Sequence, residues 1–163
     1  MRYWWFILII LLIASCDNAE ILTPGGEFDS YEGGIPAARI REAINEQIPG
    51  TAWHVFLGDP TYMSYSQSDV ERFMLLDNTD RIPYRSHAFD CEDFATVFAG
   101  RIKLAYPGIP CGVMWCVYYS DRQIYIHAFN VFYDGFTGRV HILDAQLDAF
   151  REPQIIAVFL VVI

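Results

Sequence analysis

The chain contains a thiol, an imidazole and a carboxylate, in that order, that together could carry out nucleophilic hydrolysis: Cys91, His127 and Asp144. A thiol becomes a nucleophile when its pKa falls, and the unpaired N–H groups and macrodipole of a helix N-terminus lower it. A neighbouring imidazole lowers the thiol pKa further and can protonate the leaving group. A carboxylate can hold that imidazole in the required tautomer. The three residues are therefore a candidate catalytic triad.

Each of these residues alone also has a plain structural explanation. Cys91 could be an inert buried cysteine, because most cysteines away from metals and disulfides behave as small hydrophobes. His127 lies in the strand-like run Tyr125–Phe129, where a histidine is often only a core residue. Asp144 follows a run of aliphatic residues, and an aspartate at a strand end commonly forms a turn. The chemical interpretation therefore depends on the three residues meeting in space.

The segment that follows Asp90 is predicted to be a helix with Cys91 at its N-terminal end. Asp90 is placed to cap this helix, and Asp93 lies in its first turn. The apolar residues keep helical spacing, which puts Cys91 on the inward-facing stripe. They are Phe94, Ala95, Val97, Phe98, Ile102 and Ala105. Two earlier helices are predicted, one from Pro36 to about Ile48 and one beginning at Ser66, with Asp69 completing an approximate capping box.

The second half of the chain is predicted to be a series of strands. They cover residues 112–119, 123–133, 139–143 and 155–163, with a turn at residues 134–138. The last run is almost wholly apolar, which predicts a strand buried on both faces. Helices followed by strands indicate an α+β fold, in which the nucleophile helix packs on one antiparallel sheet.

The N-terminus has the pattern of a bacterial lipoprotein signal. Arg2 precedes an apolar run from Tyr3 to Ile13, and Ile13-Ala14-Ser15-Cys16 resembles a lipobox. We therefore predict a signal peptide over residues 1–16, lipidation of Cys16, a flexible tether over residues 17–35, and one folded domain over residues 36–163. The alternative is a signal anchor that stays uncleaved. Either pattern implies export, and the lipid would hold the protein on the membrane, facing the periplasm or the extracellular side.

Composition excludes some partners. The 163 residues are 53% hydrophobic and carry a formal net charge of −9, with 11 Lys and Arg and no basic cluster. Nucleic-acid binding is therefore not expected. Cys111 and Cys116 are five residues apart in a strand-like run, so they should lie on opposite faces as buried thiols. No Cys and His spacing resembles a zinc site, and no organic cofactor is expected.

Read together, four fragments resemble the transglutaminase-like cysteine peptidases of bacteria. They are Phe89-Asp90-Cys91-Glu92-Asp93-Phe94-Ala95, Gly108-Ile109-Pro110, His127-Ala128-Phe129 and Ile142-Leu143-Asp144. The order of the triad is also similar to that in the papain-like domain of a mushroom agglutinin. The resemblance covers about residues 84–148. It implies a papain/transglutaminase-like fold in which Cys91 is the nucleophile, His127 the general base and acid, and Asp144 the orienting carboxylate.

The same resemblance implies a calcium ion. The periplasmic members of that family depend on calcium held by acidic residues beside the cysteine, which here are Asp90, Glu92 and Asp93. Three carboxylates next to a thiol raise its pKa, and a cation with oxygen ligands would cancel that effect. The alternative is that Asp90 and Asp93 only cap the helix.

The expected function is a membrane-tethered cysteine peptidase that forms an acyl-enzyme with a protein or peptide substrate. Its oxyanion hole would use the Cys91 N–H and a donor from Tyr84, Arg85 or Trp53. One alternative is a lipid-anchored binding protein of the same fold without turnover. Another is a cell-wall peptidase similar to the NlpC/P60 family, although that family has Ser-Gly after the cysteine, where this chain has Glu92-Asp93.

Overall fold

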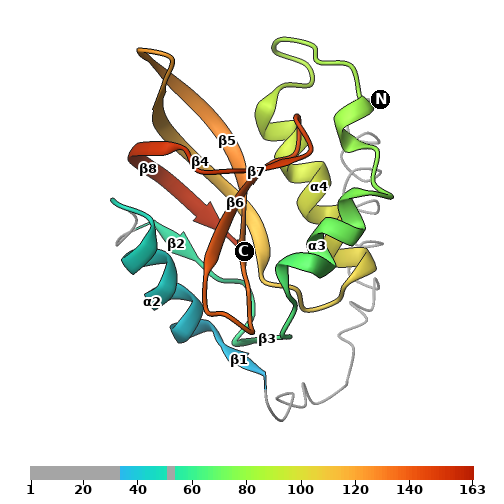
Figure 1. Ribbon diagram of the computed structural model, residues 1–163, viewed down its shortest axis with the longest axis vertical. Helices are drawn as coiled ribbons and strands as arrows, with labels where there is room; N and C mark the ends of the chain where they lie inside the picture. Colours follow the sequence, from blue (N-terminus) through green and yellow to red (C-terminus); the bar gives the residue numbers. More distant parts are fainter. Residues whose placement is uncertain (1–33, 51–53) are drawn as a thin grey trace, which may run out of the picture.

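The computed structural model describes residues 34–50 and 54–163, and in them three helices surround a curved six-stranded sheet (Figure 1). The helices are α2 (Ala37–Gln47), α3 (Gln67–Met74) and α4 (Cys91–Ala105), with a short 3₁₀ turn at Thr79–Arg81. The strands are β1 (Ile35–Pro36), β2 (Val55–Phe56), β3 (Thr61–Tyr62), β4 (Cys111–Ser120), β5 (Gln123–Tyr133), β6 (Val140–Asp144), β7 (Ala149–Arg151) and β8 (Gln154–Val162). The α+β class expected from the sequence is confirmed.

Two of the helices begin at capping boxes. The box of Ser66 and Asp69 was predicted, whereas at the second helix the prediction was a cap by Asp90 with Asp93 in the first turn. At the start of α3, the Ser66 N–H donates to Asp69 Oδ2 at 2.9 Å, and the Asp69 N–H donates to Ser66 Oγ at 3.3 Å. At the start of α4, the Asp90 N–H donates to Asp93 Oδ2 at 3.0 Å, while the Asp90 side chain accepts the Asp93 N–H. These reciprocal bonds satisfy N–H groups that a helix leaves unpaired, and they fix Cys91 as the first residue of α4.

The sheet has the strand order β2-β8-β4-β5-β6-β7, and its pairs are antiparallel except for β2 with β8, which are parallel. The prediction of a wholly antiparallel sheet is therefore wrong at this edge. β2 was not predicted, because two residues carry too little of the period-two pattern to indicate a strand. Where β8 runs beside β4, a Cβ on Gly112 would lie 1.8 Å from the Val162 carbonyl oxygen, so only glycine fits.

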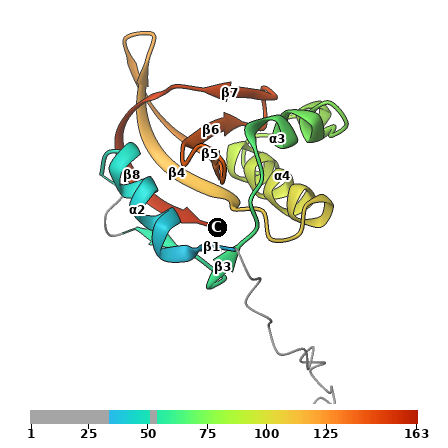
Figure 2. The ribbon, with the colours of Figure 1, turned by 60° about the horizontal axis from the view of Figure 1, so that its bottom comes forward.

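Strand β5 lies at the centre of the fold because its second half is buried on both faces. Phe129, Val131 and Tyr133 pack in the cluster that includes Ile40 and Ile44 of α2. The alternate residues face the other way, and Phe132 packs in the cluster formed with Phe94, Phe98 and Ile102 of α4. Figure 2 shows α2 and α4 on opposite sides of the sheet. A shift of one residue in β5 would exchange these two faces.

The prediction that the last strand is buried on both faces is wrong. Val158 and Val161 of β8 are buried in the cluster on the α2 side, but Ile156 and Phe159 are each 51% exposed. The run is apolar throughout, so it lacks the polar alternation that would have indicated a half-exposed strand. Only one face of β8 contributes to the core.

The predicted signal peptide and lipidated Cys16 lie outside the described residues. The predicted tether reaches Ile35, but this residue is buried and pairs with Tyr62 in the small β1–β3 sheet, so the described domain begins slightly earlier than expected. Within residues 34–50 and 54–163, no helix is long and apolar enough to cross a membrane.

Candidate active site

The start of α4 meets strand β5 beyond the end of β6. The β5–β6 pairing ends at Asn130 opposite Leu143, so β6 does not pair with His127 or Ala128. The Ala128 N–H donates a hydrogen bond to the Cys91 thiol at this position. Cys91 is partly buried and packs against a cluster of small residues that α4 and the sheet share: Ala95, Ala99, Val113 and Ala128. The fold therefore holds the thiol at the helix N-terminus and against the sheet.

His127 lies between the thiol and a carboxylate. Its Nε2 is 3.2 Å from Asp144 Oδ2, and the two side chains are only 15% and 8% exposed. The imidazole also forms a hydrogen bond with the Cys91 thiol, and the other ring nitrogen, Nδ1, remains for it. Asp144 is itself held in place, because its Oδ1 accepts the Gln146 N–H at 3.0 Å. The three residues singled out from the sequence are thus brought together.

Two aromatic rings hold the imidazole in this orientation. Phe129 packs edge-on against His127 with the ring centroids 4.5 Å apart, and Tyr118 of β4 lies 6.1 Å from it. Tyr118 also packs edge-on against Phe129, with their ring centroids 5.2 Å apart. Sequence reasoning did not assign Phe129 or Tyr118 to the site. Phe129 could have been found, because it lies two residues after His127 on the same strand face, whereas Tyr118 depends on how β4 and β5 pair.

These contacts shift both titrating groups toward their charged forms. The hydrogen bond with His127 lowers the pKa of the Cys91 thiol, burial raises it, and the Ala128 N–H lowers it again, so the net shift is downward. Asp90 raises this pKa, but its influence is smaller than these three. Burial lowers the pKa of His127, while hydrogen bonds with Asp144 and Cys91 raise it, to about 9. Both shifts favour a thiolate beside an imidazolium over a neutral thiol beside a neutral imidazole.

The other two cysteines have the opposite environment. Cys111 and Cys116 are free thiols with no exposed surface, and burial raises the pKa of each to about 12. They lie in different core clusters, on the α4 and α2 sides of the sheet, as predicted from their odd spacing. In the part of the chain that the structure describes, Cys91 is the cysteine whose pKa is lowered.

Asn130 connects the helix to the sheet. Its Nδ2 donates to the Ala95 carbonyl of α4 at 2.8 Å and to the Gly112 carbonyl of β4 at 3.0 Å. Asn130 is completely buried, on the β5 face opposite His127, and its role is to hold α4 against β4 and β5.

Two of the acidic residues beside Cys91 cap the helix. Asp90 and Asp93 use their carboxylates in the capping box, although the buried Asp90 Oδ1 has no hydrogen-bond partner. Among residues 34–50 and 54–163, no three His, Cys, Asp or Glu side chains are grouped closely enough to hold a metal ion. The calcium ion, with Asp90, Glu92 and Asp93 as its ligands, stays a prediction from the resemblance, and no chemical step below runs through it.

The main-chain donors for an oxyanion begin at Cys91. Its N–H belongs to the first turn of α4, where backbone N–H groups have no acceptor within the helix. Tyr84 and Arg85, both exposed, precede a closed turn in which Arg85 and Phe89 exchange backbone hydrogen bonds of 2.9 and 2.8 Å. Trp53, the third predicted donor, lies outside the described residues.

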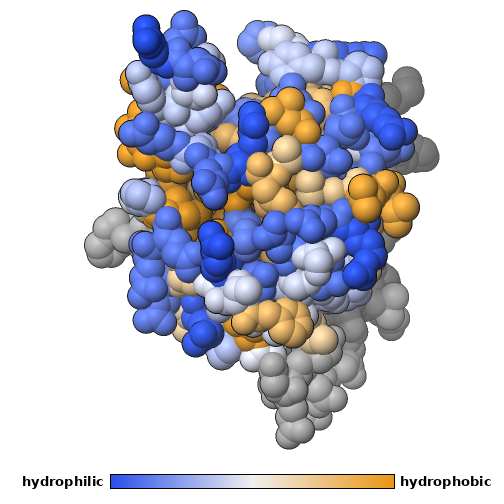
Figure 3. Space-filling view, in the orientation of Figure 1, coloured by the Kyte–Doolittle hydropathy of each residue, from blue (hydrophilic) through white to orange (hydrophobic). Residues whose placement is uncertain are grey.

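Figure 3 shows a notch in the surface between the β4–β5 hairpin and the segment that precedes α4.

His141 does not take part in the site. It lies between Phe132 and Phe150, 6.1 and 5.7 Å from their ring centroids, and burial lowers its pKa. Its Nε2 is 4.0 Å from Asp134, a buried residue that caps the turn between β5 and β6. His54 and His87 are exposed.

Comparison with known proteins finds similarity only at the level of structure. No protein-family model matches the chain, and no match was found among curated proteins. Similar solved structures include a complex of PSL1a with E64, which is 18% identical with a TM-score of 0.64 over 78% of this chain and 50% of that chain. They also include the lectin of Polyporus squamosus bound to the human-type influenza-binding epitope Neu5Acα2-6Galβ1-4GlcNAc, which is 18% identical with a TM-score of 0.61 over 77% of this chain and 48% of that chain.

The chain therefore spans about half the length of each of these proteins. At 18% identity the likeness concerns the fold, and it carries over neither an activity nor a ligand. What is established is an α+β domain similar in fold to part of PSL1a and of the Polyporus squamosus lectin.

Proposed function

We propose that this protein is a cysteine hydrolase of the papain/transglutaminase-like type, and that it cleaves peptide bonds through Cys91, His127 and Asp144. The observation that carries the proposal is the position of His127. One imidazole contacts both the thiol at a helix N-terminus and a buried carboxylate 3.2 Å away. A core histidine needs only one polar partner, whereas this pair of partners is the one that nucleophilic catalysis uses.

The reaction would proceed through an acyl-enzyme. The Cys91 thiolate attacks the peptide carbonyl carbon, and the oxyanion that forms accepts hydrogen bonds from the Cys91 N–H and a second donor. The C–N bond then breaks as the imidazolium of His127 gives its proton to the leaving nitrogen. Water attacks the thioester while His127 takes its proton, and cleavage of the C–S bond returns the thiolate–imidazolium pair. Asp144 stays ionised throughout and holds the imidazole in place.

Lipid anchoring and export remain part of the proposal. They rest on the signal-like residues 1–16 and would place the domain on the outer side of a membrane, with a protein or peptide substrate. The alternative of a binding protein with the same fold uses the same contacts only for packing. The two alternatives differ in one measurable property, the reactivity of the Cys91 thiol. The hydrolase requires an activated thiol, whereas the binding protein does not.

An epoxide that reacts with activated thiolates separates the two. E64, which is named with PSL1a above, is an epoxysuccinyl compound whose ring opens on attack by a thiolate. We expect the native protein at neutral pH to gain a single E64 adduct, located on Cys91 by peptide mapping after intact-mass spectrometry. The reason is that Cys91 combines a lowered pKa with partial exposure.

Matched variants make this experiment decisive. Cys111→Ala is expected to react as the wild type does, because Cys111 is buried with a raised pKa, and Cys91→Ala is expected to gain no adduct. If native protein gains no adduct, or if the label is spread evenly over Cys91, Cys111 and Cys116, the Cys91 thiol is not activated and the binding-protein alternative stands.

A further inference from the structure

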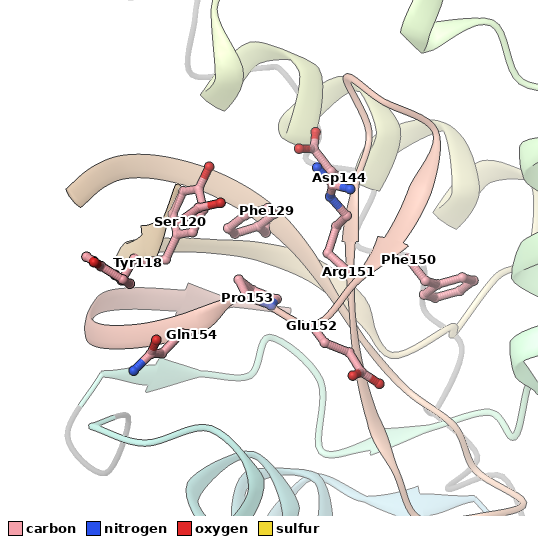
Figure 4. A pocket seen from close by; sticks show the side chains of 10 residues that line it. Tyr118, Ser120, Phe129, Asp144, Phe150, Arg151, Glu152, Pro153 and Gln154 are labelled. Atoms are coloured by element: carbon pink, nitrogen blue, oxygen red, sulfur yellow. The ribbon is translucent and has the colours of Figure 1, made fainter. Parts of the chain in front are cut away.

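A cavity of about 410 Å³ lies beside the carboxylate of the site. Asp144 lines it together with Tyr118, Phe129 and Arg151 (Figure 4). Because Nε2 of His127 faces Asp144, the hydrogen bond to Cys91 uses the other ring nitrogen, Nδ1. The order in space is therefore thiol, imidazole, carboxylate and cavity.

One wall of this cavity is aromatic. Tyr118 and Phe129 contact each other at 5.2 Å, and both pack near the imidazole. Tyr125 extends this surface along the β4–β5 hairpin, stacked on Tyr118 with the ring centroids 5.4 Å apart. Such a wall suits an aromatic or aliphatic side chain, which buries apolar area against the rings.

Arg151 supplies a positive charge at the same place. It lies opposite Ile142 in the β6–β7 pair, so its side chain shares a sheet face with Asp144, one diagonal position away. Figure 4 shows its guanidinium directed toward Asp144, while Glu152 and Gln154 point away from Asp144. Among residues 34–50 and 54–163, the Arg151 side chain has no hydrogen-bond partner and no ion pair.

Arg151 therefore remains available to a ligand. The charge of Asp144 is already compensated by the His127 imidazolium, and both of its oxygens have partners. Burial raises the pKa of Tyr118, Asp144 raises it further and Arg151 lowers it, so the phenol lies within electrostatic reach of both charges. A guanidinium with free donors is well suited to a carboxylate, which it can bind through two parallel hydrogen bonds.

We propose that this cavity is the leaving-group subsite of the reaction, and that it selects peptides in which an apolar or aromatic residue after the cleaved bond is followed by an acidic one. The inference rests on the proposed function. His127 gives its proton to the leaving nitrogen, so the leaving half of the substrate must extend past the imidazole toward the cavity. The first residue then packs on Tyr118, which is partly exposed and is itself backed by the buried Phe129, and the carboxylate of the second binds Arg151.

Competition between amines for the acyl-enzyme tests this subsite directly. Benzyloxycarbonyl-glycine p-nitrophenyl ester acylates Cys91 without occupying the leaving-group side with a peptide. An added amine that binds the subsite attacks the thioester, forming a C–N bond as the C–S bond breaks and its proton passes to His127. We expect Phe-Asp-amide to be incorporated about fivefold more efficiently than Phe-Asn-amide, as a partly exposed charge pair predicts.

The readout is the ratio of the two peptide products formed by one variant. Both products come from the same acyl-enzyme, so a change in the rate of acylation does not alter this ratio. Arg151→Gln is expected to bring the ratio to about one, because the carboxylate then has no cation to bind. Arg122→Gln, at the tip of the β4–β5 hairpin and outside the cavity, is the matched control and is expected to keep the wild-type ratio.

The outcomes separate the subsite from the hydrolase. If nitrophenol release does not depend on Cys91, the proposed function fails and the subsite falls with it. If release depends on Cys91 but the wild type shows no preference, or if Arg151→Gln keeps the preference, the subsite alone is overturned. A cavity that binds carbohydrate instead would give this last pattern.

Discussion

Cys91→Ala is expected to lower kcat/KM by a factor on the order of 10⁵ or more, since residues that act as a unit in covalent catalysis lose nearly all rate when the nucleophile is removed. In the proposed reaction the thiolate forms the bond to the substrate carbonyl, and no other cysteine of the described residues is accessible. Hydrolysis of benzyloxycarbonyl-glycine p-nitrophenyl ester, measured against the uncatalysed rate, gives this factor without knowledge of the natural substrate.

Cys111→Ala is the control for this substitution. It also replaces a thiol by a methyl group, but at a buried site in the cluster beneath α4, and it lowers the free energy of unfolding by about 1 kcal/mol. Its activity is expected to match the wild type at a temperature where both are folded. Activity of Cys91→Ala within tenfold of the wild type would remove the nucleophile from the mechanism.

Asp144→Asn is expected to lower kcat/KM by about 10²–10⁴-fold while the fold is kept. The amide has the size of the carboxylate and can still accept the Gln146 N–H, so the turn after β6 stays closed. It has no negative charge, however, and therefore no longer favours the imidazolium of His127. The thiolate then loses the cation that lowers its pKa.

The same substitution changes the dependence of rate on pH. In the wild type, kcat/KM falls as the pH rises through about 9, because His127 loses the proton that the leaving nitrogen needs. Without the carboxylate the pKa of His127 is lower, so this fall moves to lower pH. Asp121→Asn at the hairpin tip, where the backbone φ of 49° suits asparagine, is the matched control and keeps the wild-type profile. An alkaline limb that stays in place in Asp144→Asn would contradict the role of the carboxylate.

The start of the nucleophile helix could be predicted because its signals are local. Asp90 and Asp93 form a capping box that is visible in four residues of sequence, and the apolar spacing after Cys91 shows which side of α4 faces inward. The contact between His127 and Asp144 could not be predicted from these local signals. It requires β5 and β6 to pair with Asn130 opposite Leu143, a long-range register that no local pattern of residues shows.

The features that were missed depend on long-range packing. Arg151 is the last residue of a strand of only three residues, and nothing near it in the sequence shows that its side chain shares a face with Asp144. The parallel pairing of β2 with β8 joins segments about a hundred residues apart through two residues of β2. The burial of β8 was overestimated because an apolar run does not tell whether one face or two are covered.

We propose that Cys91 is a thiolate at neutral pH because the neighbouring imidazolium of His127 stabilises its negative charge. The most direct measurement is the rate at which iodoacetamide alkylates Cys91 in the native protein, followed from acidic to alkaline pH in the wild type and in His127→Ala. We predict a wild-type inflection below the ordinary thiol pKa of about 8.5, and an inflection in the variant that moves up toward that value. A wild-type inflection at or above the ordinary value, unchanged in His127→Ala, would contradict the account.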